Sequence, residues 1–188
     1  EIPSVPDVAA LLKDYRGEGP VAKGEAFDPT PENIEARVIR RALPGGMKLA
    51  LLPKKTRGGT VVAQLGLRWG DESSKLGRST ACGIASAMLM RGTKKRTREQ
   101  LANEFARLKA NVGVGGEGGS IETVRESLPQ ALRLVAEVLR EPSFPESEFE
   151  QLRRSSLAGL EIQKQDPGAL ARIELVRHLN PHAPEHWH

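Results

Sequence analysis

Alternation of apolar and polar residues predicts three short strands in the first part of the chain. Turn-forming residues separate these strand-like runs, which cover residues 34–43, 47–52 and 60–69. One face of the third run is apolar with a period of two and consists of Val61, Ala63, Leu65, Leu67 and Trp69. Neighbouring runs joined by short turns are typical of an antiparallel meander.

Apolar residues recur at helical spacing in the rest of the chain. Thr97, followed three residues later by Gln100, forms a capping box that predicts the start of a helix. Ser127 and Pro129 begin a second predicted helix, which ends before Pro142. Its apolar stripe consists of Leu128, Ala131, Leu132, Val135, Val138 and Leu139.

Two more helices and two strands complete the predicted order. The third helix runs from about Pro145 to Gln165 and carries on one side Phe149, Leu152, Ser156, Leu157 and Leu160. The fourth runs from Asp166 to Leu179, and strands at residues 111–115 and 120–126 join across glycines between the first and second helices. This order predicts an α+β fold in which helices pack on a mainly antiparallel sheet.

Composition places the chain among globular proteins of single-domain size. It has 188 residues, of which 38% are hydrophobic and 28% charged, and a formal net charge of +4. No run approaches the roughly 20 apolar residues that span a bilayer. We predict a short helix (5–15) and an inter-domain linker within residues 1–32, the folded domain over 33–180, and a C-terminal tail over 181–188.

The segment over residues 80–105 resembles the metal-binding region of the pitrilysin/insulinase zinc metallopeptidases. Met88-Leu89 and Gly92-Thr93 stand where that family has the same residues after its His-x-x-Glu-His motif. Residues 128–154 are similar to the family's apolar helix, Phe-Pro-Glu passage and acidic helix, and the Pro-Gly-Gly turn at 44–46 is similar to that of its opening hairpin. The resemblance implies one α+β half-unit, several of which enclose a chamber.

The residues that would hold zinc are missing from this half-unit. Aligned on Met88, the family's His, Glu and His fall on Gly83, Ser86 and Ala87, none of which can bind zinc or act as a base. Residues 1–177 contain no His, so no other register restores the motif. The family's third ligand, a Glu, falls near Ala158, Gly159 and Glu161. We therefore predict no catalytic, cofactor-binding or metal-binding residue in this chain.

The resemblance implies an inactive peptidase-like domain that completes a substrate chamber and supports binding of an extended peptide. Zinc is expected in a catalytic half, on the same polypeptide or on a separate subunit, so that the parent protein would be a zinc metalloendopeptidase. The alternative is a stand-alone, non-catalytic assembly or protein-binding module of the same family. The residues leave the compartment open, and the resemblance alone points to a bacterial periplasm or cell envelope.

Four His residues near the C-terminus form a separate candidate for metal chemistry. His178, His182 and His186 have i, i+4 spacing, and His188 ends the sequence. Prolines interrupt any helix that would align their side chains. We predict a tail that binds metal adventitiously rather than a physiological zinc site.

Other candidate residues have a structural interpretation. Two basic clusters lack the aromatic residues or reading helix of a nucleic-acid binder, so we expect solvated loops and no nucleic-acid partner; they consist of Lys54, Lys55, Arg57, Arg91, Lys94, Lys95, Arg96 and Arg98. The glycine-rich residues 113–119 predict a turn rather than a phosphate cradle, because no helix follows them. The single Cys82 excludes an intramolecular disulfide and is expected to be a small buried hydrophobe. Trp69 is expected in core or inter-domain packing.

Overall fold

The computed structural model describes residues 13–14 and 21–179 and divides into two compact units, Glu1–Thr60 and Val61–His188. The helix expected over residues 5–15 lies almost entirely, and the tail over 181–188 entirely, outside the described residues. No helix in the described ranges is both long enough and apolar enough to cross a bilayer.

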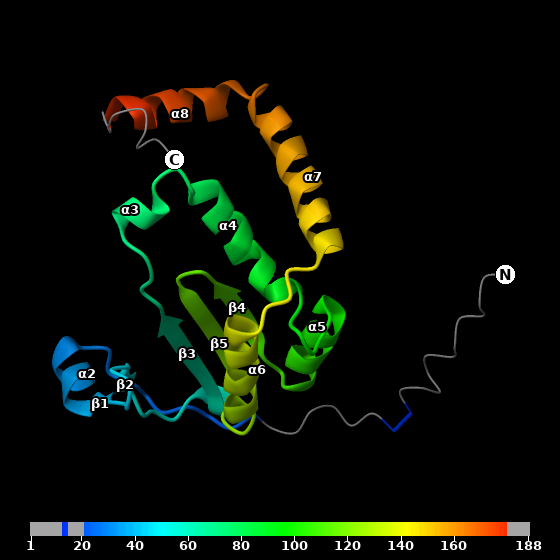
Figure 1. Cartoon of the computed structure of the whole chain (residues 1–188). Helices are drawn as coiled ribbons and strands as arrows, with labels where there is room; N and C mark the ends of the chain where they lie inside the picture. Colours follow the sequence, from blue (N-terminus) through cyan, green and yellow to red (C-terminus); the bar gives the residue numbers. More distant parts are fainter. Residues whose placement is uncertain (1–12, 15–20, 180–188) are drawn as a thin grey trace. The chain divides into compact units, whose positions relative to one another are not determined.

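The first unit contains one α-helix, one hairpin and one 3-10 helix among its described residues (Figure 1). Helix α2 covers Pro31–Arg37, and strands β1 (Ile39–Ala42) and β2 (Lys48–Leu51) pair antiparallel, followed by the 3-10 helix η1 (Arg57–Gly59). The predicted strand from residue 34 was wrong over its first part, which is helical. Pro31 fits the first helical turn, where its missing N–H costs nothing, and Glu32 and Arg37 suit the two ends of the helix dipole.

The second unit is built on a three-stranded sheet with the order β3–β5–β4. These strands are Thr60–Gly66, Gly118–Val124 and Asn111–Gly115, and β4 and β5 pair antiparallel from Asn111↔Glu122 to Gly115↔Gly118. The predicted meander was wrong because β3 pairs with β5, whereas β1 and β2 form a sheet of their own. The apolar face of β3 explains this pairing, because its Ala63 packs against the core of the second unit. Strand β1, by contrast, is exposed along its whole length.

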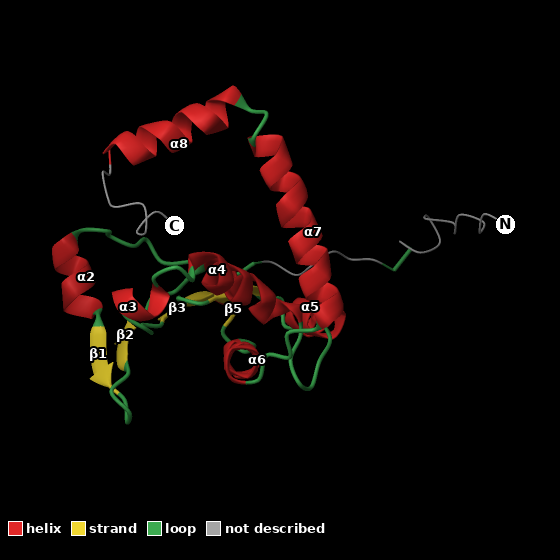
Figure 2. Ribbon diagram, turned by 45° about the horizontal axis from the view of Figure 1, so that its top comes forward, coloured by secondary structure: helices red, strands yellow, loops and turns green. Residues whose placement is uncertain are grey.

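The predicted helices are confirmed with small changes at their ends. The helices of the second unit are α3 (Glu72–Lys75), α4 (Ser79–Met88), the 3-10 helix η2 (Leu89–Arg91), α5 (Arg98–Arg107), α6 (Leu128–Arg140), α7 (Glu146–Gln163) and α8 (Pro167–Leu179). Figure 2 shows α4 and α6 on opposite sides of the sheet. The α+β class with antiparallel sheets is therefore confirmed.

The core of the second unit lies between α5, α6 and the face of the sheet opposite α4. It consists of Leu101, Phe105, Leu108, Ile121, Ala131, Leu134, Val135 and Val138. The stripe predicted for α6 was wrong at one position: Leu132 is 45% exposed, and Leu134 is buried in its place. Leu132 and Leu134 lie on opposite flanks of the same stripe, so the sequence pattern does not decide which of the two is buried.

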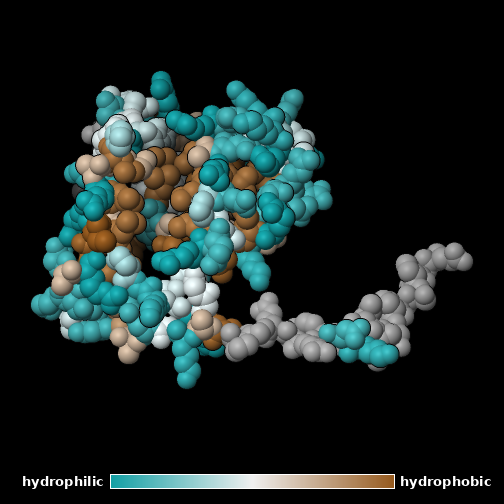
Figure 3. Space-filling view, turned by 90° about the horizontal axis from the view of Figure 1, so that it is seen from below, coloured by the Kyte–Doolittle hydropathy of each residue, from teal (hydrophilic) through white to brown (hydrophobic). Residues whose placement is uncertain are grey.

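Helices α7 and α8 expose much apolar surface. Their large apolar side chains that are more than a third exposed are Phe149, Leu157, Leu160, Ile162, Leu170, Ile173, Leu175, Val176 and Leu179. Apolar atoms also lie open between polar ones on the face that Figure 3 shows from below. The one-sided pattern predicted for α7 is thus present but uncovered.

Candidate functional site

Helix α4 carries the positions at which the pitrilysin family has its zinc motif. Its last residue, Met88, is buried, which fixes the C-terminal end of the helix against the domain. Earlier on the helix, Cys82 is half-buried and Gly83 is exposed. Ala87, directly before Met88, is also exposed. The side chain of Ser86 faces the sheet, where its Oγ accepts a hydrogen bond of 2.8 Å from the backbone N–H of Gly116.

The glycine-rich segment forms the turn between β4 and β5, as predicted. Gly118 has φ +136°, and a Cβ atom there would lie 1.7 Å from the backbone oxygen of Leu65, so that only glycine fits. A Cβ atom at Gly115 would lie 3.0 Å from the Oγ of Ser86. Glycine at these positions allows the turn to approach both β3 and α4 closely.

A cavity of about 570 Å³ lies between α4 and this turn. Its lining residues are Trp69, Cys82, Gly83, Ser86, Gly113, Gly115, Gly116, Glu117, Gly118, Gly119 and Ser120. Trp69 is 43% exposed, and the Nζ atom of Lys75 lies 4.7 Å from the centre of its ring. Trp69 is thus not a core residue, and its alternative role in inter-domain packing stays a prediction; Cys82 is half-buried rather than buried, and both residues line the cavity.

The side chains at the zinc positions do not fit the metal. Gly83 and Ala87 offer no ligand atom, and the hydroxyl of Ser86 is neither a usual zinc ligand nor free of a partner. On α7, Ala158 and Gly159 offer none either, and the exposed Glu161 pairs with Lys164 at 2.8 Å. Within residues 13–14 and 21–179, no three His, Cys, Asp or Glu side chains gather as a metal site would require.

The His-rich tail falls mostly outside the described part of the chain. His178 lies in the last turn of α8, and the other three His residues belong to the segment that the structure does not describe. Whether this tail binds metal stays a prediction.

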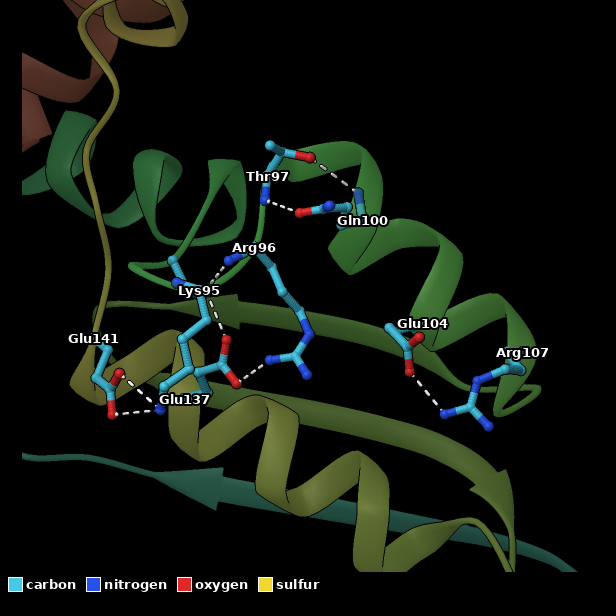
Figure 4. Close-up of polar contacts among 9 residues, drawn as sticks. Lys95, Arg96, Thr97, Gln100, Glu104, Arg107, Glu137 and Glu141 are labelled. Atoms are coloured by element: carbon cyan, nitrogen blue, oxygen red, sulfur yellow. Dashed lines mark hydrogen bonds and ion pairs between the residues drawn. The ribbon is translucent and has the colours of Figure 1, made fainter.

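The basic cluster at residues 91–98 is bound to acidic residues, and Figure 4 shows the pairs that Lys95 and Arg96 form. Arg96 forms an ion pair with Glu137 of α6, Lys95 pairs with Glu141 at 3.0 Å, and Arg91 and Arg98 both reach Glu148 of α7. A second cavity, of about 450 Å³, is lined by parts of this cluster. Because these cations already have carboxylate partners, the cluster holds the loop to α6 and α7.

Glu137 is the centre of this arrangement. Burial raises its pKa, but hydrogen bonds from Thr93 (2.7 Å) and Arg96, with the positive charge of Arg96, outweigh burial and hold the pKa below its usual value. At the start of α5, the predicted capping box is confirmed: the Thr97 hydroxyl accepts from the Gln100 backbone N–H at 3.2 Å, and the Thr97 N–H donates to the Gln100 side chain at 2.9 Å.

Sequence reasoning missed two features of this region. The Glu137 side chain was not recognised as a partner of the basic loop, because residues 41 and 44 positions apart in sequence gave no local signal. The α4 cavity, whose floor consists of residues with small side chains, was also missed. Its signal in the sequence is the alternation of Val112 and Val114 with Gly113 and Gly115, which puts both glycines on one face of β4.

Comparison with known proteins supports the resemblance seen in the sequence. No protein-family model and no curated protein matches the chain. A crystal structure of a peptidase M16 inactive domain from Pseudomonas fluorescens is similar, with a TM-score of 0.59 and 27% identity over 74% of this chain and 35% of that one. This match therefore spans about a third of that protein's length. The chain is similar, in fold and in sequence, to an inactive peptidase-like domain of the pitrilysin type.

Proposed function

We propose that this chain is a non-catalytic peptidase-like domain that helps to enclose an extended peptide for a zinc-containing catalytic half. The observation that carries the proposal is the C-terminal part of α4: on a fold similar to a solved inactive domain, it presents Gly83, Ser86 and Ala87 and binds the β4–β5 turn through Ser86. This part of the helix supports the sheet and supplies no metal ligand.

Strand β4 supplies a place for the peptide. It is the outer strand in the order β3–β5–β4, so one of its sides has no partner strand among the described residues. An extended peptide adds to such an edge through backbone hydrogen bonds and places alternate side chains on each face of the sheet. The cavity beside α4 is lined by Gly113 and Gly115 of β4 together with residues of the neighbouring strand β5.

The partner surface consists of the exposed apolar residues of α7 and α8. Apolar side chains gathered on this scale mark a protein interface rather than ordinary surface. We propose that the catalytic half binds to this surface. Protein interfaces commonly have an apolar centre and a polar rim, and the exposed apolar residues would form that centre. A stand-alone assembly module would use the same surface with a different partner and would need no peptide at β4.

The proposal is tested with purified chain lacking residues 181–188. We expect a fluorescently labelled, unstructured peptide to bind without being cleaved, and elemental analysis to find no stoichiometric zinc. The matched control is a peptide of the same composition with proline at alternate positions, which cannot add as a strand and is expected not to bind. Addition of a catalytic half with the His-x-x-Glu-His motif is expected to give both zinc and cleavage.

Two results would contradict the proposal in different ways. Stoichiometric zinc with cleavage by this chain alone would show that it is catalytic. Failure of every peptide to bind, with tight binding of a protein partner through α7 and α8, would favour the stand-alone module.

A further inference from the structure

The two faces of β4 differ sharply in side-chain size. Val112 and Val114 pack against the core, whereas Gly113 and Gly115 line the cavity on the α4 side. On the neighbouring strand, the residue opposite Gly113 is Ser120, which also lines this cavity. We call the strip formed by Gly113, Gly115 and Ser120 the glycine trough. Its floor carries no side chain larger than serine.

The walls of the trough are mostly uncharged. Cys82, Gly83 and Ser86 of α4 form one wall, and the ring of Trp69 lies beside the turn: a Cβ atom at Gly116 would lie 3.5 Å from this ring. Among the described residues of the lining, Glu117 alone is charged, and it is exposed; the Lys75 ammonium lies over the Trp69 ring and is not part of the lining. A large uncharged side chain fits the small, uncharged floor, whereas a carboxylate on that floor would lose hydration.

The trough lies where a side chain of an added strand would point. A residue directly across from Gly113 on an added strand would place its Cβ atom about 4.5–5.5 Å away, on the same face of the sheet. Glycine at 113 leaves that space open down to the backbone. We propose that the glycine trough holds one large uncharged side chain, aromatic or long aliphatic, of a peptide added to β4, and so sets which peptide segments bind. This inference rests on the proposed peptide-binding function.

The test fills the trough from its floor. Gly113→Val is suited to it, because the backbone of Gly113 is not left-handed and a Cβ atom there would lie at an ordinary 3.4 Å from its nearest neighbour, the Oγ of Ser120. The matched control is Asn111→Val, the same new side chain on the same face of β4 but outside the cavity lining. The probes are three labelled unstructured peptides that differ only in a central Phe, Ala or Asp.

We expect the unaltered chain to bind the Phe peptide about tenfold more tightly than the Ala peptide, as burial of an aromatic side chain predicts, and to bind the Asp peptide most weakly. Gly113→Val should abolish the preference for Phe. Its affinity for the Ala peptide should stay within about twofold of that of the unaltered chain, because loss of the backbone pairing would weaken binding by more than this. Asn111→Val should keep the preference.

The single Cys82 gives a second readout that needs no substitution. Because its side chain lies in the trough wall, the bound Phe peptide should slow alkylation of Cys82 by N-phenylmaleimide, and the Asp peptide should not. Equal affinity for the three peptides, or equal alkylation rates, would overturn the trough while leaving peptide binding intact. Failure of all three to bind would overturn both the trough and the proposed function.

Discussion

Gly118 is the residue on which the contact between the β4–β5 turn and β3 depends. Its φ of +136° and the 1.7 Å approach of a Cβ atom to the Leu65 oxygen mean that a substitution must displace backbone, not a flexible side chain. We expect Gly118→Ala to lower the free energy of unfolding by about 2–4 kcal/mol, from backbone strain and overpacking together. Gly66→Ala is the control, because nothing lies within 4 Å of a Cβ atom there. Urea unfolding compares the two, and equal losses would contradict the account.

Asp71 shows how local hydrogen bonds alone shift a surface carboxyl. The backbone N–H and side chain of Ser74, with the hydroxyl of Ser73, lower the pKa of Asp71 to about 2. The stability that this gives the turn is complete above the ordinary carboxyl pKa near 3.8 and is lost as pH falls through about 2. An NMR titration of the Asp71 carboxyl should find its midpoint near 2, and in Ser74→Ala the midpoint should move up toward 3.8. An ordinary midpoint in the unaltered chain would show that these hydrogen bonds do not form in solution.

At the scale of single elements, α7 and α8 carry many apolar residues that the described chain leaves exposed. We expect the purified chain to bind the dye ANS and to self-associate with rising concentration. Leu157→Gln with Leu160→Gln should reduce both effects without lowering the urea midpoint, because neither side chain is in the core. Val62→Gln, a comparably exposed position on β3, is the control and should change neither. A large drop in the urea midpoint of the double variant would show that these leucines are buried in solution.

The sequence predicted elements well where a local rule determines them. The capping box at Thr97 and the proline at the start of α6 placed two helices correctly, because capping and proline geometry depend on neighbours only a few residues away. Residues 34–37 were misassigned because Ile34 and Ala36 continue the alternation of the following strand, and so short a segment fits a strand and a helix alike. The partner of β3 was missed for a different reason: β5 begins more than fifty residues later, and no local pattern specifies a pairing at that distance.

For the candidate site, the sequence alone showed which residue types stand at the zinc-motif positions, but not the shape of the site. The absence of His from the first 177 residues can be read directly, and so can the positions of Gly83, Ser86 and Ala87. The cavity and the Ser86–Gly116 hydrogen bond depend on how α4 lies over the turn, which is a property of tertiary packing. The same holds for Trp69 and Cys82, whose apolar character predicted burial although the fold places them at a cavity.

For the whole molecule, the two units should differ in how readily their backbone opens. The buried core belongs to the second unit, whereas β1 and β2 are exposed at nearly every position. In hydrogen–deuterium exchange, the amides of α5, α6 and β5 should exchange slowest, at rates set by global unfolding, and those of β1 and β2 much faster. Equal protection of the hairpin and β5 would mean that the units unfold together.

The hydrogen bond between Ser86 and Gly116 also sets what it would take to engineer a peptidase from this chain. Writing His, Glu and His into positions 83, 86 and 87 would remove the hydroxyl that accepts from the Gly116 N–H. The longer Glu side chain would also enter space in which the backbone at Gly115 already closely approaches a serine. Because α4 and the β4–β5 turn pack closely against each other, a gain of peptidase activity would require redesign of the turn as well as of the helix. Three substitutions on α4 alone would yield a strained helix rather than an enzyme.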